Sequence, residues 1–155
     1  MKRLLFVLTV LVLTFAVAAM ALEDPFVGTW KTNMAKSQVS TNPGPKSNIA
    51  KLQAIENGLK IEQDIVEADG KASHREYNWI LNGKDFPYPD NSALTMNCTR
   101  PDAHTIICTV KTKIGMEVGR IEDVLSKDGK TGTVTTTGRT AKGESIREVM
   151  VNERQ

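Results

Sequence analysis

The segment NGLKIEQDIVEADG, residues 57–70, decides the fold class. It begins with Asn57-Gly58 and ends with Asp69-Gly70, dipeptides that supply the positive φ angles of tight hairpin turns. Between the two turns, apolar and charged residues alternate from Leu59 to Val66, with Gln63 as an exception on the apolar side. A period of two indicates a strand with one face on a core. The segment therefore predicts one strand between two antiparallel neighbours.

Similar turns recur along the chain at intervals of about 12 to 14 residues, apart from one wider gap after Gly83. Such spacing leaves room only for strands of ordinary length, and no stretch shows a helical period beyond a short turn at residues 34–37. We therefore expect an all-β fold, a single up-and-down antiparallel meander barrel of about 8 to 10 strands. The expected strands are residues 27–33, 48–56, 59–66, 72–81, 85–88, 93–100, 105–113, 116–125, 131–138 and 144–152.

Pairing across the first hairpin follows from its turn. If Asn57-Gly58 is a two-residue loop, the odd-numbered residues of 59–66 face the core together with even-numbered residues of 48–56. The expected pairs are Ala54 with Ile61, Leu52 with Gln63, and Ala50 with Ile65.

The second hairpin, around Asp69-Gly70, fits a three-residue loop best. A two-residue loop would turn His74, Glu76 and Asn78 inward, which is costly. The three-residue loop gives an inner face with two large aromatic side chains beside polar ones, a mixture that suits a cavity wall as well as a core. Its inward residues are Arg75, Tyr77, Trp79 and Leu81.

The N-terminus has the pattern of an export signal. Lys2 and Arg3 precede an apolar stretch, residues 4–18, and the small-x-small site Ala19-Met20-Ala21. We predict a cleaved signal peptide, residues 1–21, and one domain, residues 22–155, that is exported to the periplasm or the extracellular space. A permanent membrane anchor is the alternative, since the apolar stretch approaches the length of a bilayer span.

The charge of the mature chain excludes some partners. Loss of Lys2 and Arg3 leaves 18 of the 20 basic residues against 18 acidic ones. A net charge near zero predicts no nucleic-acid binding and no stable attachment to a membrane once the signal is cleaved. We expect a monomer.

The only two cysteines, Cys98 and Cys108, are predicted to form a structural disulfide. If residues 102–104 are a three-residue loop, Pro101 pairs with Thr105 and Cys98 lies directly opposite Cys108, within disulfide reach. An oxidising compartment favours the bond, with two free buried thiols as the alternative. The neighbours that share the inward face are Leu94, Met96, Ile106 and Val110.

Catalytic and metal-binding patterns are not recognisable. His74 and His104 lie on different segments without a partner at ligand spacing, so we expect both in solvent and predict no metal and no cofactor. No motif joins a nucleophile, a base and an orienting group, and the carboxylates are interpreted as surface charges. We therefore expect a protein that is not an enzyme.

Residues 24–31, DPFVGTWK, resemble the opening of the calycin group, the lipocalins and fatty-acid-binding proteins. There a Gly-x-Trp begins the first strand after a short helical turn. Residues 148–154 are similar in style to the last strand of the fatty-acid-binding proteins. With the turns DGK at 69–71, NGKD at 82–85 and SKDGK at 126–130, nearly the whole mature chain resembles small exported bacterial proteins of lipocalin-like type.

The resemblance implies a lipocalin-like barrel in which Gly28 and Trp30 are structural. In the calycins this Trp packs across the closed end beneath a basic residue from a late strand, here Arg120 or Arg147. The helix pair that covers fatty-acid-binding proteins has no counterpart, because a Pro-rich loop occupies residues 40–47. Nor is there the Arg and Tyr pair near the C-terminus that holds a fatty-acid carboxylate in that family.

The resemblance and the mixed inner face together predict that the barrel binds a small apolar or amphipathic molecule. Gln63, Arg75 and Tyr77 would orient this small hydrophobic ligand, and Ile61, Trp79 and Met96 would form the apolar wall.

Each of these residues also has a structural interpretation. Tyr77 and Trp79 would fill the core, Arg75 would pair with a carboxylate such as Glu56, and Gln63 would bond to a neighbouring strand. In that case the chain is a non-enzymatic envelope interaction or inhibitor module with a filled barrel core that uses loops 41–47 and 87–92. A haem-binding barrel would require His74 to face inward, against the pattern.

Overall fold

The computed structural model describes residues 23–40, 43–89, 91–139 and 143–155. The predicted signal peptide lies outside the described residues, as do Thr41, Asn42 and Asp90 of the two candidate loops. In the described part of the chain, no helix is long and apolar enough to cross a membrane.

All ten expected strands are present, with bounds within about three residues of those expected. The predicted helical turn after the first strand is a single 3-10 turn, η1 (Met34–Lys36). The strands are β1 (Gly28–Thr32), β2 (Ser47–Ile55), β3 (Gly58–Val66), β4 (Ala72–Ile80), β5 (Asp85–Tyr88), β6 (Asn91–Asp102), β7 (Thr105–Thr112), β8 (Glu117–Leu125), β9 (Thr131–Arg139) and β10 (Ser145–Arg154).

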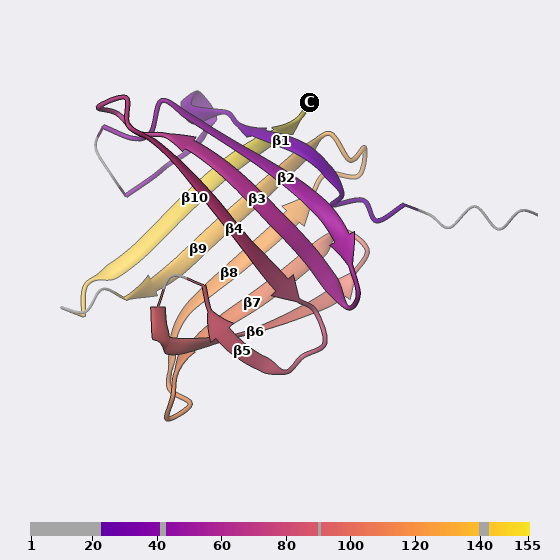
Figure 1. Ribbon diagram of the computed structural model, residues 1–155, viewed down its shortest axis with the longest axis vertical. Coiled ribbons are helices and arrows are strands. Elements are labelled where there is room, and N and C mark those ends of the chain that lie inside the picture. Colours follow the sequence, from indigo (N-terminus) through magenta and orange to yellow (C-terminus); the bar gives the residue numbers. More distant parts are fainter. Residues whose placement is uncertain (1–22, 41–42, 90, 140–142) are drawn as a thin grey trace, which may run out of the picture.

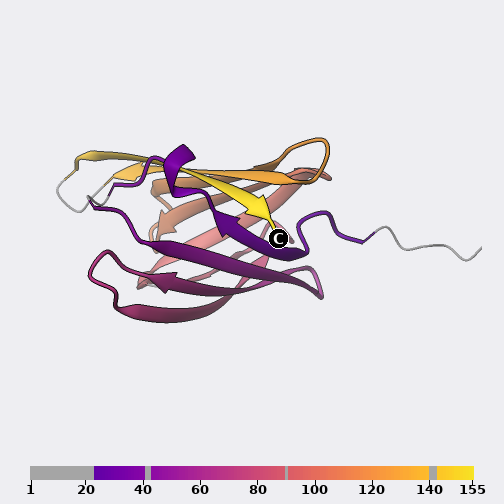
Figure 2. The ribbon, with the colours of Figure 1, turned by 90° about the horizontal axis from the view of Figure 1, so that it is seen from above.

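The strands form one antiparallel up-and-down sheet in the order β4-β3-β2-β1-β10-β9-β8-β7-β6-β5. Because β1 pairs with both β2 and β10, the sheet curls on itself, and β1–β4 cross over β5–β10 (Figure 1). Figure 2 shows the two layers from above, with β3 and β4 on one side and β9 and β10 on the other. β4 and β5 form the two edges, and β4 approaches β6 across the remaining opening. The all-β meander barrel is therefore confirmed as nearly closed.

The register of the β2–β3 hairpin differs from the expected one by two residues. Leu52 pairs with Ile61, not Gln63, and Ala50 pairs with Gln63. The turn is Glu56-Asn57, in which Asn57 takes the left-handed conformation at φ 58°, and Gly58 begins the strand. A Cβ on Gly58 would lie 2.0 Å from the carbonyl oxygen of Trp79, so glycine is required there by a close approach of β4. A shift of two residues keeps the predicted inner faces.

The β3–β4 hairpin has the expected register. Glu67 N–H donates to the carbonyl of Lys71 across a three-residue loop, and Gln63 lies opposite Arg75. The odd-numbered residues of both strands therefore share the inner face.

The predicted disulfide between Cys98 and Cys108 is present. The two residues are directly opposed on β6 and β7 and fully buried beside Met96, Ile106 and Val110. The predicted pair of Pro101 with Thr105 is wrong, since a bulge follows Thr99 and Asp102 takes the place opposite Thr105.

The closed end of the barrel is built around Trp30. The indole Nε1 donates to the carbonyl of Phe26 at 2.9 Å, and the guanidinium of Arg154 lies 4.3 Å from the ring centre. The prediction of a basic residue from a late strand is therefore right, but both named candidates are wrong. Arg120 and Arg147 are exposed on the outer face, whereas Arg154 lies at the end of β10 beside β1.

Backbone carbonyls hold Arg154 in place. Its guanidinium donates to the carbonyls of Gly129 at 2.8 Å and Val27 at 2.6 Å, and also to that of Pro25. Gly28 lies beneath it at φ 141°, where a Cβ would come within 2.5 Å of Arg154 Nη1. The Gly-x-Trp pattern thus leaves room for the guanidinium.

Candidate functional site: the barrel cavity

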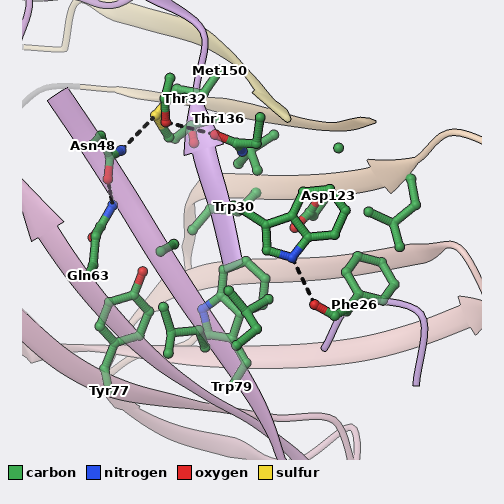
Figure 3. A pocket seen from close by; sticks show the side chains of 18 residues that line it. Phe26, Trp30, Thr32, Asn48, Gln63, Tyr77, Trp79, Asp123, Thr136 and Met150 are labelled. Carbon is green, nitrogen blue, oxygen red and sulfur yellow. Dashed lines mark hydrogen bonds between the residues drawn. The ribbon is translucent and has the colours of Figure 1, made fainter. Parts of the chain in front are cut away.

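A cavity of about 140 Å³ lies inside the barrel, above the closed end. Its wall comes from seven strands and from Phe26, and the side chains converge on a common interior (Figure 3). The eighteen lining residues are Phe26, Trp30, Thr32, Asn48, Ala50, Leu52, Ile61, Gln63, Tyr77, Trp79, Ile121, Asp123, Leu125, Gly132, Val134, Thr136, Met150 and Asn152.

Most of this wall is apolar, because β2, β3 and β8 turn their aliphatic side chains inward. Leu52, Ile61 and Leu125 are buried there. The aromatic rings of Trp30 and Trp79 also face the cavity (Figure 3). An apolar interior of this kind holds a ligand by excluding water from it.

A group of polar side chains lies on one side of the cavity. Gln63 Nε2 donates to Asn48 Oδ1 at 3.0 Å, and Asn48 Nδ2 lies 3.9 Å from the sulfur of Met150 (Figure 3). Thr32 Oγ1 donates to Asn152 Oδ1 at 2.7 Å. Because these side chains hydrogen-bond to one another, the cost of burying them is reduced.

Asp123 is the exception. It projects from β8 into the cavity, and the residue is only 8% exposed. Its Oδ1 atom is buried and has no hydrogen-bond partner among the described residues. Burial raises the pKa of this carboxyl from 3.8 to about 7, since the charged form loses its hydration. A carboxyl that changes its charge near neutral pH therefore faces the cavity.

A wider space of about 380 Å³ continues from the cavity to the mouth of the barrel. The two spaces share wall residues, among them Asn48, Gln63 and Trp79. The mouth is framed by the segments around Val39, the β3–β4 turn and the β5–β6 turn. In the described residues between β1 and β2, η1 is the only helical element, so the covering helix pair has no counterpart there.

The six residues predicted to bind a ligand lie around these two spaces. Ile61 lines the inner cavity, whereas Arg75 and Met96 line the wider space, Arg75 at its exposed end and Met96 in the buried core. Gln63, Tyr77 and Trp79 contribute to both. Their contact with a ligand stays a prediction. The hydrogen bond of Gln63 to Asn48 also agrees with the structural interpretation of that residue.

The interpretation of all carboxylates as surface charges is wrong for Asp123. The strand pattern contained the information needed to find it. Cys108 faces inward and pairs with Ile121 on β8, so Gly119, Asp123 and Leu125 share the inward face with Ile121. Asp123 is thus the one charged residue in an otherwise apolar inner face, and such a residue calls for a partner.

The histidines contribute nothing to the cavity. His74 is exposed on the outer face, where Nδ1 lies 2.7 Å from Asp64 Oδ1, and His104 is half-buried in the β6–β7 turn. The described residues contain no group of three or more His, Cys, Asp or Glu side chains that could hold a metal ion.

No family model matches the sequence, and no curated protein sequence matches it either. Solved structures do match. The ileal bile acid-binding protein of zebrafish, complexed with cholic acid, superposes with a TM-score of 0.53 at 12% identity, over 84% of this chain and 99% of the other. The fold is the calycin fold.

Two further calycin-like structures agree. The N57A mutant of the fluorescent protein UnaG gives a TM-score of 0.56 at 14% identity, over 84% of this chain and 96% of the other. The extracellular fatty acid binding protein As-p18 gives 0.50 at 15% identity, over 85% and 97%. The predicted likeness to the calycins is confirmed at the level of the fold. Two of the three proteins are named for a ligand, and none is named for a reaction.

Proposed function

We propose that the protein is an exported, monomeric carrier or sensor that binds a small apolar or amphipathic molecule inside its barrel. The observation that carries the proposal is the cavity itself, with its apolar wall, its few converging polar groups and its path to the mouth. The cavity favours this proposal over the alternative interaction module, which requires a filled barrel core.

The structural neighbours support the same class of ligand. One is a bile acid-binding protein and another is a fatty acid binding protein, and both have this fold. A bile acid is amphipathic, and a fatty acid is largely apolar. Because the identities are 12% and 15%, the likeness supports the class and not the particular molecule.

Export is supported by the pattern of residues 1–21 and by the buried Cys98–Cys108 disulfide, since such bonds persist in oxidising compartments. The name of As-p18 also describes an extracellular protein. We expect intact mass spectrometry of the protein from its own host to give a chain that begins at Leu22 with the disulfide formed. A chain that retains Met1 would refute cleavage.

The binding proposal is tested on protein purified from its host without refolding. Native mass spectrometry should show a small molecule that leaves on mild activation. After delipidation, octanol should change the fluorescence of the two tryptophans, because Trp30 and Trp79 both line the cavity.

A pair of alanine variants on β2 supplies the control. Ala50 lines the cavity, whereas Ala54 is exposed on the same strand. Ala50→Phe should fill the space and abolish the octanol response, and Ala54→Phe should retain it. An equal response in both variants would place the bound molecule outside the barrel.

We further propose that Ile61, Gln63, Arg75, Tyr77, Trp79 and Met96 contact the ligand. A Gln63→Leu, Arg75→Leu double variant should weaken binding of an amphipathic ligand more than that of a purely apolar one, because only the former uses the polar groups. Competition titrations with the co-purified molecule and with heptane measure the difference.

A further inference from the structure

We propose that the cavity selects an amphipathic organic amine, with its ammonium group against the carboxylate of Asp123 and the rest of the molecule directed toward the mouth. This inference rests on the proposed function, because it names the chemical class that the same cavity takes. Four features of the interior lead to it.

The first feature is the unsatisfied carboxyl. Oδ1 of Asp123 is buried without a hydrogen-bond partner in the described part of the chain, while the other buried polar side chains of the wall, Thr32 and Asn48, are bonded. A buried carboxylate is unfavourable unless a cation or donors meet it. A ligand with an N–H donor would provide the hydrogen bond that Oδ1 of Asp123 lacks in the described part of the protein.

The second feature is the sign of the charge. Asp123 is the only charged residue among the eighteen that line the cavity, which include no Lys, Arg or His. Arg154, the cation at the closed end, is already engaged by the carbonyls of Gly129 and Val27. An anionic head group would therefore meet a like charge and no cation at the inner end, whereas an ammonium would meet its opposite.

The third feature is aromatic. Phe26, Trp30 and Trp79 line the same space as Asp123 (Figure 3). Trp30 and the carboxyl both approach Gly132, where a Cβ would lie 3.6 Å from Asp123 Oδ1 and 3.8 Å from Trp30 Cζ3. Ring faces attract cations, most strongly where water is excluded. The indole N–H of Trp30 donates to the carbonyl of Phe26, so it does not hydrogen-bond to Asp123 in place of the ligand's ammonium group.

The fourth feature is size. A cavity of about 140 Å³ is close to the roughly 150 Å³ engineered cavity that takes a benzene molecule. The inner end thus fits a head group with a short apolar stem, and a longer tail has to extend into the wider space below the mouth.

Binding of an amine should depend on pH through Asp123. Among the described residues, no other charged group faces the carboxyl. Its cross-strand neighbours are Ile106 on β7 and Val134 on β9, and Tyr77 is the only other titratable residue among those that line the cavity. An alkylamine stays protonated well above pH 8, as lysine does. Affinity should therefore rise between pH 6 and 8 as the carboxyl ionises.

The test compares octylamine, octanol and octanoate, which share one chain and differ in head-group charge. At pH 8 we expect the wild-type protein to bind octylamine about tenfold more tightly than octanol, and octanoate more weakly than either. Asp123→Asn keeps the shape of the side chain and should remove the preference while leaving octanol binding unchanged.

Glu148→Gln provides the matched control. Glu148 is a carboxylate at the mouth, where it accepts a hydrogen bond from the Ser40 N–H, so its removal should leave the preference for octylamine intact. If Asp123→Asn does not fold, the pH dependence of wild-type binding still decides. Octylamine affinity that stays flat or falls from pH 6 to 8 overturns the proposal.

The outcomes separate this inference from the proposed function. Equal binding of all three probes, or tightest binding of octanoate, overturns the amine and leaves the carrier in place. A preference for octylamine that is lost in Glu148→Gln and kept in Asp123→Asn also overturns it, by moving the site to the mouth. No binding of any probe, with no co-purified molecule, would refute the carrier itself.

Discussion

At the scale of single residues, Asp123 links stability to pH. Its pKa is 3.8 in the unfolded chain and about 7 in the folded one, because burial disfavours the charged form. Between these values the folded state holds the proton more tightly than the unfolded state. The contribution of Asp123 to stability is therefore highest below pH 4, falls as the pH rises to 7, and stays constant above that.

Asp123→Asn should make the free protein more stable at pH 8, by on the order of 4 kcal/mol, because no charge is then buried. The difference from wild type should vanish below about pH 3, where Asp123 is protonated in both the folded and the unfolded wild-type chain. Urea denaturation at a series of pH values measures it. Glu117→Gln, at an exposed position on the same strand, should follow the wild-type profile. If the free energy of unfolding of Asp123→Asn differs from that of wild type by the same amount at every pH from 4 to 8, the carboxyl is not desolvated.

Arg154 is the second residue on which much depends. Replacing it with Met should lower the free energy of unfolding by about 2 to 4 kcal/mol, because the carbonyls of Val27 and Gly129 lose a charged donor and Trp30 loses its cation. Denaturation followed by tryptophan fluorescence measures the loss. Arg147→Met, at an exposed position on the same strand, should change stability by less than about 0.5 kcal/mol. Equal effects would mean that the closed end does not depend on Arg154.

At the scale of elements, two neighbouring positions of the β2–β3 hairpin differ in the side chains they tolerate: Gly58 has no room for a Cβ, whereas Asn57 has a backbone conformation that glycine also adopts. Gly58→Ala should destabilise the protein by about 3 kcal/mol or more, since its Cβ would lie 2.0 Å from a backbone oxygen of β4. Asn57→Gly should be tolerated within about 1 kcal/mol, because Asn57 already has φ 58°. Thermal denaturation distinguishes them. A tolerated Gly58→Ala would show that β4 moves away freely.

The β6–β7 hairpin is cross-linked by the Cys98–Cys108 disulfide. The bond closes a short loop with a sequence separation of 10 residues, so its removal should lower stability by about 2 to 3 kcal/mol. The test is chemical denaturation of the wild type and of the Cys98→Ala, Cys108→Ala variant, each with and without reductant. Reductant should lower the denaturation midpoint of the wild type and leave that of the double variant unchanged. A shift in both would indicate an effect unrelated to this bond.

At the scale of the whole molecule, the barrel has one open side. β4 and β5 each bond to a single neighbour, whereas β9 bonds to two. Backbone amides in residues 72–80 should therefore exchange with deuterium faster than those in residues 131–139, by about tenfold or more. Hydrogen exchange followed by mass spectrometry measures both segments in one experiment. Equal protection would show that the β4 edge is covered, and a bound ligand should slow the β4 segment most.

The architecture could be predicted because local and global patterns agree in this chain. Turn dipeptides such as Asp69-Gly70 and the alternation from Leu59 to Val66 indicated the strands and their inner faces. Local patterns could not resolve whether Asn57 or Gly58 carries the left-handed turn, because both tolerate it. That choice depends on how closely β4 passes over Gly58, which is a tertiary contact.

The site was predictable only in part, for a related reason. The parity of strands places Ile61 and Trp79 inside, but it does not show which of several arginines reaches Trp30. Arg154 does so through the pairing of β1 with β10, distant in sequence. The alternation of faces along β8 also predicts that Asp123 points inward, once Ile121 is paired with the inward-facing Cys108.

Because β1 pairs with β10, the barrel cannot close until the C-terminal strand has been synthesised. Thr32 and Asn152, which bond across this seam, are separated by 120 residues. At about 5 to 20 residues per second, a ribosome needs roughly 6 to 24 s to make that stretch, far longer than a hairpin needs to form. Throughout that time β1 lacks its second neighbour, so the nascent chain stays open and exposes the apolar side chains that later line the cavity. A chaperone that holds the chain during this interval would protect the inner face before any ligand can reach it.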